Sequence, residues 1–346
     1  MEGRLMYYVK KTIFYGLLFT IMMTVIVPVF YLTTISFSST IETYDYPKRI
    51  LPSLSHDLRV SFDEIEGYYI IQRKNTKNEY EDLYISSRFD RIQTYFEDYL
   101  NIVKTEEQLE DDFTEAKLTG DVIELRYYKN IFRNFTKFFS VFSGADQALM
   151  NSIQAALLTI IISMTIGGSV GYALARTQIK GKEAIGVASL VVRMFPVVSI
   201  SVPMAILLIR YGMFDTMIGL AIIYSIPNIG LTAWITRSIF LGINKEYEEA
   251  SYVFGATKAK TFLKITFPLV LPAFAASSMY AFITAWNDTA VSLLLTDRNQ
   301  TLALLIYKSI GGSASINYSA AGAILLILPA LVFTFLLKNY INKMWG

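Results

Sequence analysis

The residues best placed for chemistry lie in one polar stretch, residues 237–272. Three carboxylates, Glu246, Glu248 and Glu249, open a short amphipathic segment. Negative charge at the start of a helix is favourable because it faces the positive end of the helix dipole. Gly255 follows a single turn later, where a tight bend between two helices favours a residue with positive φ. This pattern predicts a short helix with an acidic start, followed by a tight turn.

The same stretch predicts a hairpin of two helices. Ala256–Lys264 can form the second helix, and Pro268 then blocks its continuation because proline lacks a backbone N–H. The stretch is amphipathic, unlike the long apolar windows on either side of it. We therefore expect a helix–turn–helix knob that projects from a membrane-embedded body.

Residues for covalent catalysis or metal binding are nearly absent from the sequence. The chain has no cysteine and one histidine, His56. A thiolate zinc site, a Cys–His dyad and a Ser–His–Asp triad are therefore not expected. No G-x-x-x-x-G-K-[S/T] motif is present, so the chain cannot bind ATP through a P-loop. We expect a non-enzyme without cofactor or metal, and no nucleic-acid partner.

The composition predicts a membrane protein. Of the 346 residues, 53% are hydrophobic and 17% are charged, whereas a soluble domain carries about a quarter charged residues. A helix needs about 20 mostly apolar residues to cross the hydrocarbon. Six windows meet this condition: Thr12–Ile35, Ser152–Ala175, Ala184–Ile209, Met213–Ile235, Leu271–Leu295 and Tyr318–Leu337. The expected fold is an all-α polytopic membrane protein.

The distribution of basic residues predicts the orientation. With the N-terminus inside, the inner segments hold 13 Lys or Arg, from Arg4 to Lys343, against 3 in the short outer loops. The positive-inside rule then places both termini in the cytoplasm. The expected location of the multi-pass chain is the cytoplasmic membrane of a prokaryote, as the family resemblance given below implies.

The segment between the first two spans is expected to form an α+β module outside the cell. From Phe37 to Ala145 it carries 20 acidic and 14 basic residues. Strands are predicted at Tyr68–Ile71, Tyr80–Ile85 and Val122–Tyr128, and a helix over Phe89–Val103. The acidic excess fits a solvated surface, and a docking surface or a lid is the functional alternative. The expected organisation is a first span in 1–36, an insert in 37–150 and a core in 151–346.

Five polar or aromatic residues within the predicted spans are candidates for a translocation path. Arg193 and Asp288 are charged, and a charge at mid-bilayer costs on the order of 3 kcal/mol on insertion scales. Asn228, Asn287 and Trp286 could offer hydrogen bonds and an aromatic face to a sugar. The alternatives are snorkelling for the two charges and ordinary packing for the tryptophan.

The polar stretch resembles the EAA loop of ABC importer permeases, written E-A-A-x3-G-x9-I-x-L-P. Glutamate, first alanine, glycine, isoleucine and proline fall at the expected spacing, while Ser251 and Phe267 replace the second alanine and the leucine. The resemblance implies that this loop couples to an ATPase, and it assigns that role to Glu249, Ala250, Ser251, Gly255, Ile265 and Pro268.

Other stretches are similar to MalG-type carbohydrate permeases. They are Asn151–Ser152, Tyr172–Arg176, Met194–Pro196 and Trp286–Asp288. The resemblance implies the six-helix architecture of a type I ABC importer permease. Two departures are the long insert, 42–125, and a C-terminus at Lys343–Gly346 without a Gly-rich basic tail.

The resemblance also implies the partners. They are a dimer of ABC ATPases that holds the ATP and Mg²⁺, a second MalF-like permease subunit, an extracytoplasmic sugar-binding protein, the sugar and membrane lipid. The expected function is import of a sugar, such as an oligosaccharide, driven by the separate ATPase. Two alternatives stay open, namely a permease for polyamine or phosphate, and a membrane sensor or scaffold with an outer binding module.

Overall fold

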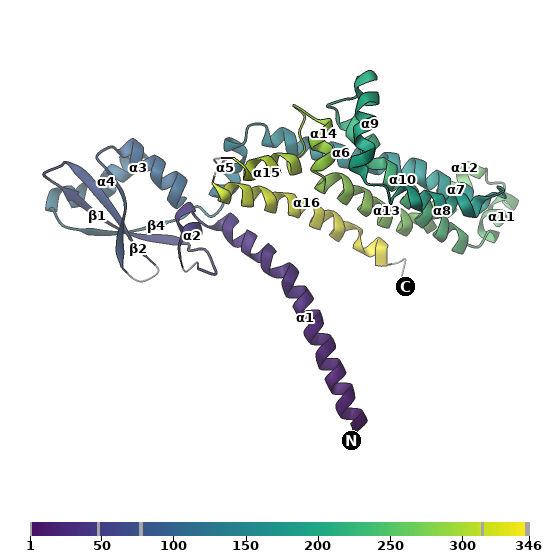
Figure 1. Cartoon of the computed structure of the whole chain (residues 1–346), viewed down its shortest axis with the longest axis horizontal. Helices are drawn as coiled ribbons and strands as arrows, with labels where there is room; N and C mark the ends of the chain where they lie inside the picture. The colour runs from purple at the N-terminus through teal and green to yellow at the C-terminus, as the bar shows by residue number, and fades with distance from the viewer. Residues whose placement is uncertain (1, 47–48, 76–78, 313–314, 343–346) are drawn as a thin grey trace. The chain divides into compact units, whose positions relative to one another are not determined.

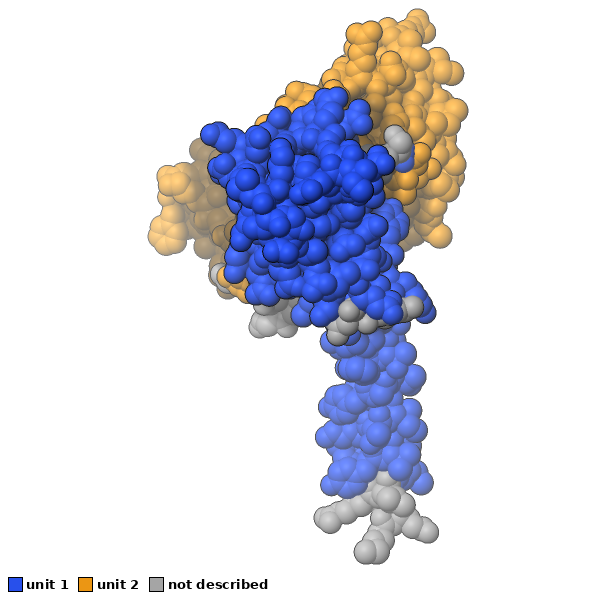
Figure 2. Space-filling view, turned by 90° about the vertical axis from the view of Figure 1, so that its left-hand side faces the viewer, with its two compact units in different colours: residues 1–141, 312–324 blue, residues 142–311, 325–346 orange. Residues whose placement is uncertain are grey.

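The computed structural model describes residues 2–46, 49–75, 79–312 and 315–342. It forms two compact units, shown in different colours in Figure 2. Unit 1 comprises residues 1–141 and 312–324, and unit 2 comprises residues 142–311 and 325–346. The predicted segments 1–36, 37–150 and 151–346 follow membrane topology instead of contacts, and they stay a prediction. Lys343–Gly346 lie outside the described residues.

Unit 1 contains a long apolar helix followed by a small α+β module (Figure 1). The module has a four-stranded antiparallel sheet in the order β3-β2-β1-β4. The elements of this part of the chain are α1 (Glu2–Phe37), α2 (Thr40–Tyr44), β1 (Ser55–Asp63), β2 (Tyr68–Lys74), β3 (Tyr80–Ser86), α3 (Phe89–Tyr95), the π-helical turn η1 (Phe96–Leu100), α4 (Glu106–Thr119), β4 (Ile123–Tyr128) and α5 (Arg133–Val141).

The core of the module lies between its sheet and its helices. Leu58 and Val60 alternate along β1 and bury their side chains against Ile92, Phe96 and Phe113 from the helices. Burying a large apolar side chain contributes about 1.5–3 kcal/mol relative to leaving it in water. This core is the reason that an acidic insert folds at all.

The α+β prediction for the insert is confirmed, although several of its elements were not predicted. The predicted strands correspond to β2, β3 and β4, and the predicted helix corresponds to α3 with η1. Strand β1, the centre of the sheet, and helix α4 have no counterpart in the sequence analysis. Helix α4 begins with a capping box formed by Thr105 and Gln108, a local signal that marks its start.

Three buried asparagines fasten the end of α1 to the rest of unit 1. The side-chain amide of Asn317 donates to the carbonyls of Ile35 at 3.1 Å and Ser38 at 2.8 Å. Asn134 donates to the carbonyl of Ser38 at 2.7 Å, and Asn101 donates to Asn134 Oδ1 at 3.2 Å. These bonds satisfy carbonyls that a helix end leaves without partners. The outer end of α1 is therefore fixed within its unit.

Unit 2 is a bundle of helices in its described residues. Its elements are α6 (Ala145–Ile162), the π-helical turn η2 (Ser163–Gly167), α7 (Gly168–Arg176), α8 (Lys182–Val192), α9 (Val197–Arg210), α10 (Met217–Gly242), α11 (Glu246–Val253), α12 (Lys258–Thr261), the π-helical turn η3 (Phe262–Thr266), α13 (Phe267–Asn287), α14 (Ala290–Leu295), α15 (Leu302–Ile310) and the larger part of α16 (Ile316–Asn342). Helix α10 packs against α6, α7, α8 and α13, so it is the central element of the bundle (Figure 1).

Five helices of the described chain are long and apolar enough to cross a membrane. A sixth span is possible if α8 and α9 are counted together. The candidate spans are Met6–Phe37, Ala145–Arg176, Met217–Gly242, Lys258–Asn287 and Ile316–Tyr340. The all-α polytopic prediction with up to six spans is therefore confirmed.

The third predicted span, Ala184–Ile209, is interrupted in the structure. It is divided into α8 and α9, which are bent by 91° relative to each other. Pro196 has a ψ of 123° outside the helical region, and proline also disfavours helical geometry in the residue before it. A break at Arg193–Pro196 follows from these two effects.

The fifth predicted span, Leu271–Leu295, has the wrong limits. The observed helix runs from Lys258 to Asn287. Asp288 leaves the helical conformation with a ψ of 132°, and α14 is a separate short helix. Asp288 therefore lies at a helix end instead of inside a span.

Two glycines allow the second span to approach α10 closely. A Cβ added to Gly167 would lie 2.7 Å from the carbonyl oxygen of Ile229 and from Cβ of Thr232. A Cβ on Gly171 would overlap Thr236 Oγ1. The close helix packing that G-x-x-x-G predicts is confirmed at this contact.

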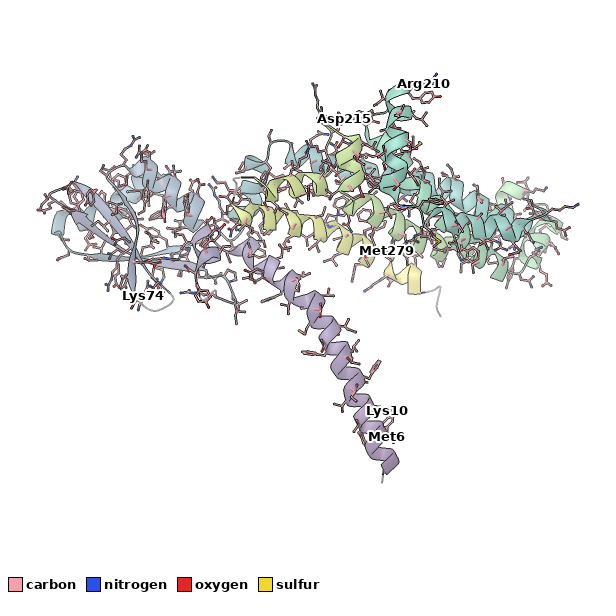
Figure 3. All side chains as sticks on the ribbon, viewed as in Figure 1. Met6, Lys10, Lys74, Arg210, Asp215 and Met279 are labelled. Carbon is pink, nitrogen blue, oxygen red and sulfur yellow. The ribbon has the colours of Figure 1, made fainter. Side chains whose placement is uncertain are left out.

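A carboxylate ties together two loops at one end of unit 2. Asp215, labelled in Figure 3, has a φ of 57° and accepts hydrogen bonds from the backbone N–H groups of Asp297 at 2.9 Å and Asn299 at 3.0 Å. The amide of Asn299 donates in turn to the carbonyl of Asp215 at 2.8 Å. The loop after α9 and the loop after α14 therefore form one fixed structure.

Candidate coupling site

The polar stretch forms the predicted helical hairpin. Helix α11 ends at Val253, and Gly255 turns the chain with a φ of 79°. The N–H of Gly255 donates to the carbonyl of Tyr252 at 2.9 Å, and Ala256 donates to Ser251 at 3.0 Å. Glycine adopts this left-handed conformation without the steric cost that a Cβ would add.

The predicted stop at Pro268 is wrong. Helix α12, η3 and α13 form one continuous helix, Lys258–Asn287. The π-helical turn Phe262–Thr266 lies directly before the proline, and the N–H of Phe267 donates to the carbonyl of Phe262. The wider turn accommodates the residue that cannot donate. The hairpin therefore continues without interruption into the fifth span.

The motif residues divide into exposed and buried positions. Glu249 and Ala250 are exposed, whereas Ser251 is buried. Ser251 Oγ lies 2.6 Å from Thr261 Oγ1, so this hydrogen bond closes the hairpin between its two helices. The serine that replaces the usual alanine thus has a partner of its own.

Glu248, which the sequence analysis did not single out, is the buried carboxylate of the hairpin. It is 7% exposed, and its Oε1 accepts from Arg176 Nε at 2.9 Å and from Thr266 Oγ1 at 3.2 Å. Glu248 and Ser251 are three residues apart and share one buried face of α11. Such an i, i+3 pair of small or polar residues is the sequence signal that would have pointed to it.

The tip of the hairpin exposes apolar side chains. Val253 is 85% exposed and Phe254 is 90% exposed, and the neighbouring Lys258, Lys260 and Glu249 are also exposed. Large apolar groups surrounded by charges mark a surface that binds another protein. The hairpin therefore has a polar, internally bonded base and an apolar, exposed tip.

Arg193 and Asn228, two of the candidate path residues, differ in their exposure and in their contacts. Arg193 is exposed at the break between α8 and α9, and its guanidinium lies 5.2 Å from the ring centre of Tyr280. Asn228 is buried, and its amide donates to the carbonyl of Tyr224 at 2.8 Å. Pro227 interrupts the hydrogen-bond ladder of α10 beside it, so Asn228 supports that helix locally.

Trp286, Asn287 and Asp288 lie together at the end of α13. Trp286 is fully buried, and its Nε1 donates to the carbonyl of Leu326 at 2.8 Å. Asp288 Oδ2 accepts from Tyr224 Oη at 3.0 Å and from the N–H of Val291 at 2.8 Å, so it caps α14 and ties it to α10. Asn287 is exposed. In this conformation the indole packs α13 on α16, and only Asn287 and Arg193 present polar groups outward.

The described residues contain no group of three or more His, Cys, Asp or Glu side chains that could hold a metal ion. Two ion pairs lie in the described part of unit 2, Arg176 with Glu248 and Arg237 with Glu183. Chemically, the hairpin can dock and transmit force, and its described side chains form no catalytic arrangement of the kinds considered above.

More than half of the chain matches one known protein family. Residues 163–346 match the family described as binding-protein-dependent transport system inner membrane component. The matched region contains the hairpin and all four spans that follow the second one. It also contains each of the candidate path residues.

Several curated proteins are similar over most of their own length. The trehalose transport system permease protein SugB of Mycobacterium tuberculosis is 31% identical over 232 residues, which cover 66% of this chain and 82% of that protein. The trehalose/maltose transport system permease protein MalG of Thermococcus litoralis is 27% identical over 56% of this chain and 71% of that protein. The maltodextrin transport system permease protein MdxG of Bacillus subtilis is 28% identical over 56% of this chain and 71% of that protein.

One solved structure is similar over nearly the whole chain. It is a bacterial ABC transporter involved in the import of the acidic polysaccharide alginate, with a TM-score of 0.56, 16% identity and coverage of 96% of both chains. At this identity the likeness establishes the fold. The similarity extends over the part of the chain that contains the insert.

Proposed function

Because this chain belongs to the family of binding-protein-dependent transport system inner membrane components, we propose that it is a permease subunit of an ATP-driven sugar importer. The exposed apolar tip of the hairpin, Val253 and Phe254, is the observation that carries the proposal. A surface of this kind, at the end of a span, needs a partner protein. An ATPase supplied by another polypeptide meets that need, since the sequence lacks a P-loop.

The proposed substrate class is based on the similar proteins. Three of them are named for trehalose, maltose or maltodextrin transport. We propose a disaccharide or short oligosaccharide as substrate, delivered by an extracytoplasmic binding protein. A second, MalF-like permease subunit completes the proposed bundle, and a pair of ATPases holds the ATP and Mg²⁺.

The proposed orientation follows from charge. The hairpin carries Lys258, Lys260 and Lys264, which the positive-inside rule assigns to the cytoplasm. The α+β module of unit 1 then lies outside the cell, with both termini inside. In this arrangement Glu249, Ala250, Gly255, Ile265 and Pro268 belong to the coupling element, with Ser251 closing it.

The proposed path for the sugar uses the polar residues of unit 2. Arg193 and Asn287 expose groups that can donate to or accept from hydroxyls. Asn228, Trp286 and Asp288 already have partners within the chain, so in this conformation they form the supporting wall. Alternating access would change these contacts when the bundle switches state.

The mechanism couples two sites on opposite faces. Closure of the ATPase pair moves the hairpin, and the hairpin moves the spans to which it is attached. Because the nucleotide and the sugar bias one conformational equilibrium, each affects the binding of the other.

A single introduced thiol tests the proposal, since the chain contains no cysteine of its own. Phe254→Cys, expressed with the products of neighbouring genes, is expected to crosslink to a nucleotide-hydrolysing subunit. Phe132→Cys, an equally apolar residue that is 59% exposed in unit 1, is the matched control and should not crosslink to that subunit. The purified complex should hydrolyse ATP faster when binding protein and trehalose or maltose are added.

Two outcomes would contradict the proposal. One is a hairpin thiol that reacts with a membrane-impermeant reagent added outside intact cells. The other is a complex whose ATP hydrolysis responds to polyamine or phosphate and to none of the sugars, which would keep the family and exclude the sugar.

A further inference from the structure

The guanidinium of Arg176 joins three helices beneath the hairpin. Arg176 is the last residue of α7, and its Nε donates to Glu248 Oε1 of α11 at 2.9 Å. Its Nη1 donates to the carbonyl of Phe240 at 2.7 Å, and its Nη2 donates to the carbonyl of Ile243 at 3.2 Å. Those two carbonyls lie at the end of α10, where a helix leaves acceptors without partners. One planar side chain thus occupies the junction of α7, α10 and α11.

Glu248 completes the junction from the other side. The same oxygen that accepts from Arg176 also accepts from Thr266 Oγ1 at 3.2 Å, and Thr266 is the last residue of η3. The side chains of Arg176 and Glu248 are 8% and 9% exposed. In such surroundings neither charge can be solvated if the other moves away, so the two groups must move together.

Another ion pair of unit 2 shows the contrast. Arg237 pairs with Glu183, whose side chain is 73% exposed and free to be hydrated. If that pair separates, the carboxylate of Glu183 can still be hydrated, although the side chain of Arg237 is itself only 8% exposed. Neither side chain of the Arg176–Glu248 pair can be hydrated in this way.

The covalent routes out of the hairpin lead to only two of the spans. Residues 243–245 connect α11 to α10, and α12 continues through η3 into α13. The second span, Ala145–Arg176, has no such connection to the hairpin. Side chains make the bond to α11 instead: Arg176 pairs with Glu248, and the hydroxyl of Tyr172 also interacts with that carboxylate.

We infer that Arg176 and Glu248 are positioning residues that transmit the motion of the hairpin to the second span. This inference rests on the proposed function. The movement of α10 and α13 follows from the continuous backbone, whereas the second span follows the hairpin through side chains, namely its packing on α10 and the buried pair with Glu248. Arginine suits the task because its fork binds three acceptors at once, which a lysine cannot do.

Paired spin labels on the full complex test the inference. One pair joins the hairpin to the second span, Tyr247→Cys with Ser169→Cys, and the other joins the hairpin to α13, Tyr247→Cys with Leu269→Cys; all three positions are exposed. With intact Arg176, the distance distributions of both label pairs should stay narrow with and without ATP. In Arg176→Gln, only the first distance should broaden when ATP is bound, and sugar imported per ATP hydrolysed should fall about tenfold.

Three further variants keep the experiment decisive. Glu248→Gln should behave like Arg176→Gln, and Arg176→Lys should give an intermediate yield because it keeps the charge and loses the fork. Asp146→Asn, which changes an exposed carboxylate of the second span outside the hairpin, is the control and should behave like the parent complex.

The inference would be overturned if Arg176→Gln kept a narrow hairpin–second-span distance and the parental import per ATP. It would equally be overturned if both label pairs broadened together, because that result means general loss of structure. Failure of the proposed function is separate from either result, since it appears in the parent complex as ATP hydrolysis that no binding protein or sugar stimulates.

Discussion

Two buried ion pairs, one in each unit, differ in the elements that they connect. In unit 1 Lys129 Nζ lies 2.6 Å from Glu42 Oε2, and the lysine is fully buried. Glu42 also accepts from the backbone N–H of Ser53 at 2.9 Å and of Ser39 at 2.7 Å. In unit 2 Arg176 and Glu248 are comparably buried, but their bonds reach α7, α10, α11 and η3.

The difference lies in what each pair holds. Glu42 and Lys129 flank one small module, so their pairing fixes the entry and exit of the chain at its sheet. Arg176 and Glu248 connect elements that belong to different spans. A buried pair therefore stabilises one folded unit in the first case and links moving parts in the second.

The largest expected effect comes from breaking the pair of unit 1. Glu42→Gln leaves the ammonium of Lys129 buried without a countercharge, which costs about 4 kcal/mol. Hydrogen exchange of β1, measured on the full chain, should become about a thousandfold faster. Asp57→Asn on the same strand is the control, because its pair with Arg126 is 61% and 63% exposed and should change exchange little. If Glu42→Gln left the hydrogen exchange of β1 unchanged, the buried pair would not stabilise unit 1.

Acid should weaken the same module. Burial lowers the pKa of His56 to about 4, although Glu42 opposes it, and Lys129 and Arg73 add to it. Burial alone would raise the pKa of Glu42, but the charge of Lys129 and the hydrogen bonds that Glu42 accepts lower it to about 2. Both groups bind fewer protons in the folded state, so stability is present at neutral pH and is lost as the pH falls.

The two pH windows separate the two groups. His56 should cost about 3 kcal/mol at most as the pH falls from 6.5 to 4, and Glu42 should act below pH 4.5. Exchange of β1, corrected for its intrinsic pH dependence, measures both. In His56→Phe, the exchange of β1 should no longer change between pH 6.5 and 4, while its change below pH 4.5 should remain. If the change between pH 6.5 and 4 persisted, another group would cause the loss of stability there.

A smaller effect is expected at the turn of the hairpin. Gly255→Ala places a Cβ in the left-handed region, which costs about 1.5 kcal/mol, although no atom lies within 4 Å of that Cβ. Exchange of α11 should become about tenfold faster. Gly242→Ala also meets no atom within 4 Å, but Gly242 is helical and should show no such loss. Equal effects at both glycines would contradict a conformational cause.

The smallest effect tests the edge of the junction in unit 2. Thr266→Val removes one hydrogen bond to Glu248 while the ion pair stays, which costs about 1 kcal/mol. Exchange of α11 should become about fivefold faster, and import per ATP should stay close to the parental value. Thr284→Val, whose hydroxyl donates to the carbonyl of Tyr280, is the matched control. A loss as large as that of Arg176→Gln would mean that the link depends on the threonine.

The sequence was sufficient for features that depend on neighbouring residues. The hairpin, its turn at Gly255 and the strands β2, β3 and β4 follow from local spacing and side-chain type. The break before Pro196 also follows from the sequence, since the pre-proline effect is local.

The remaining features depend on distant partners. Three glutamates open α11, and the one that is buried is selected by Arg176, which lies 72 residues away in the chain. Pro268 failed as a stop because the π-helical turn before it is permitted by packing around Phe262. Trp286 was a candidate for sugar contact until the carbonyl of Leu326 proved to be its partner.

The π-helical turn Phe262–Thr266 also has a consequence for how lineages of this protein can change. Each residue of an α-helix rotates the chain by about 100°, so gain or loss of one residue in this turn would swing the hairpin tip to another side of the fifth span. The helices would still fold after such a gain or loss, but Phe254 would face away from the ATPase. Single-residue insertions there should persist only in lineages whose ATPase has shifted its receiving cleft by the same angle.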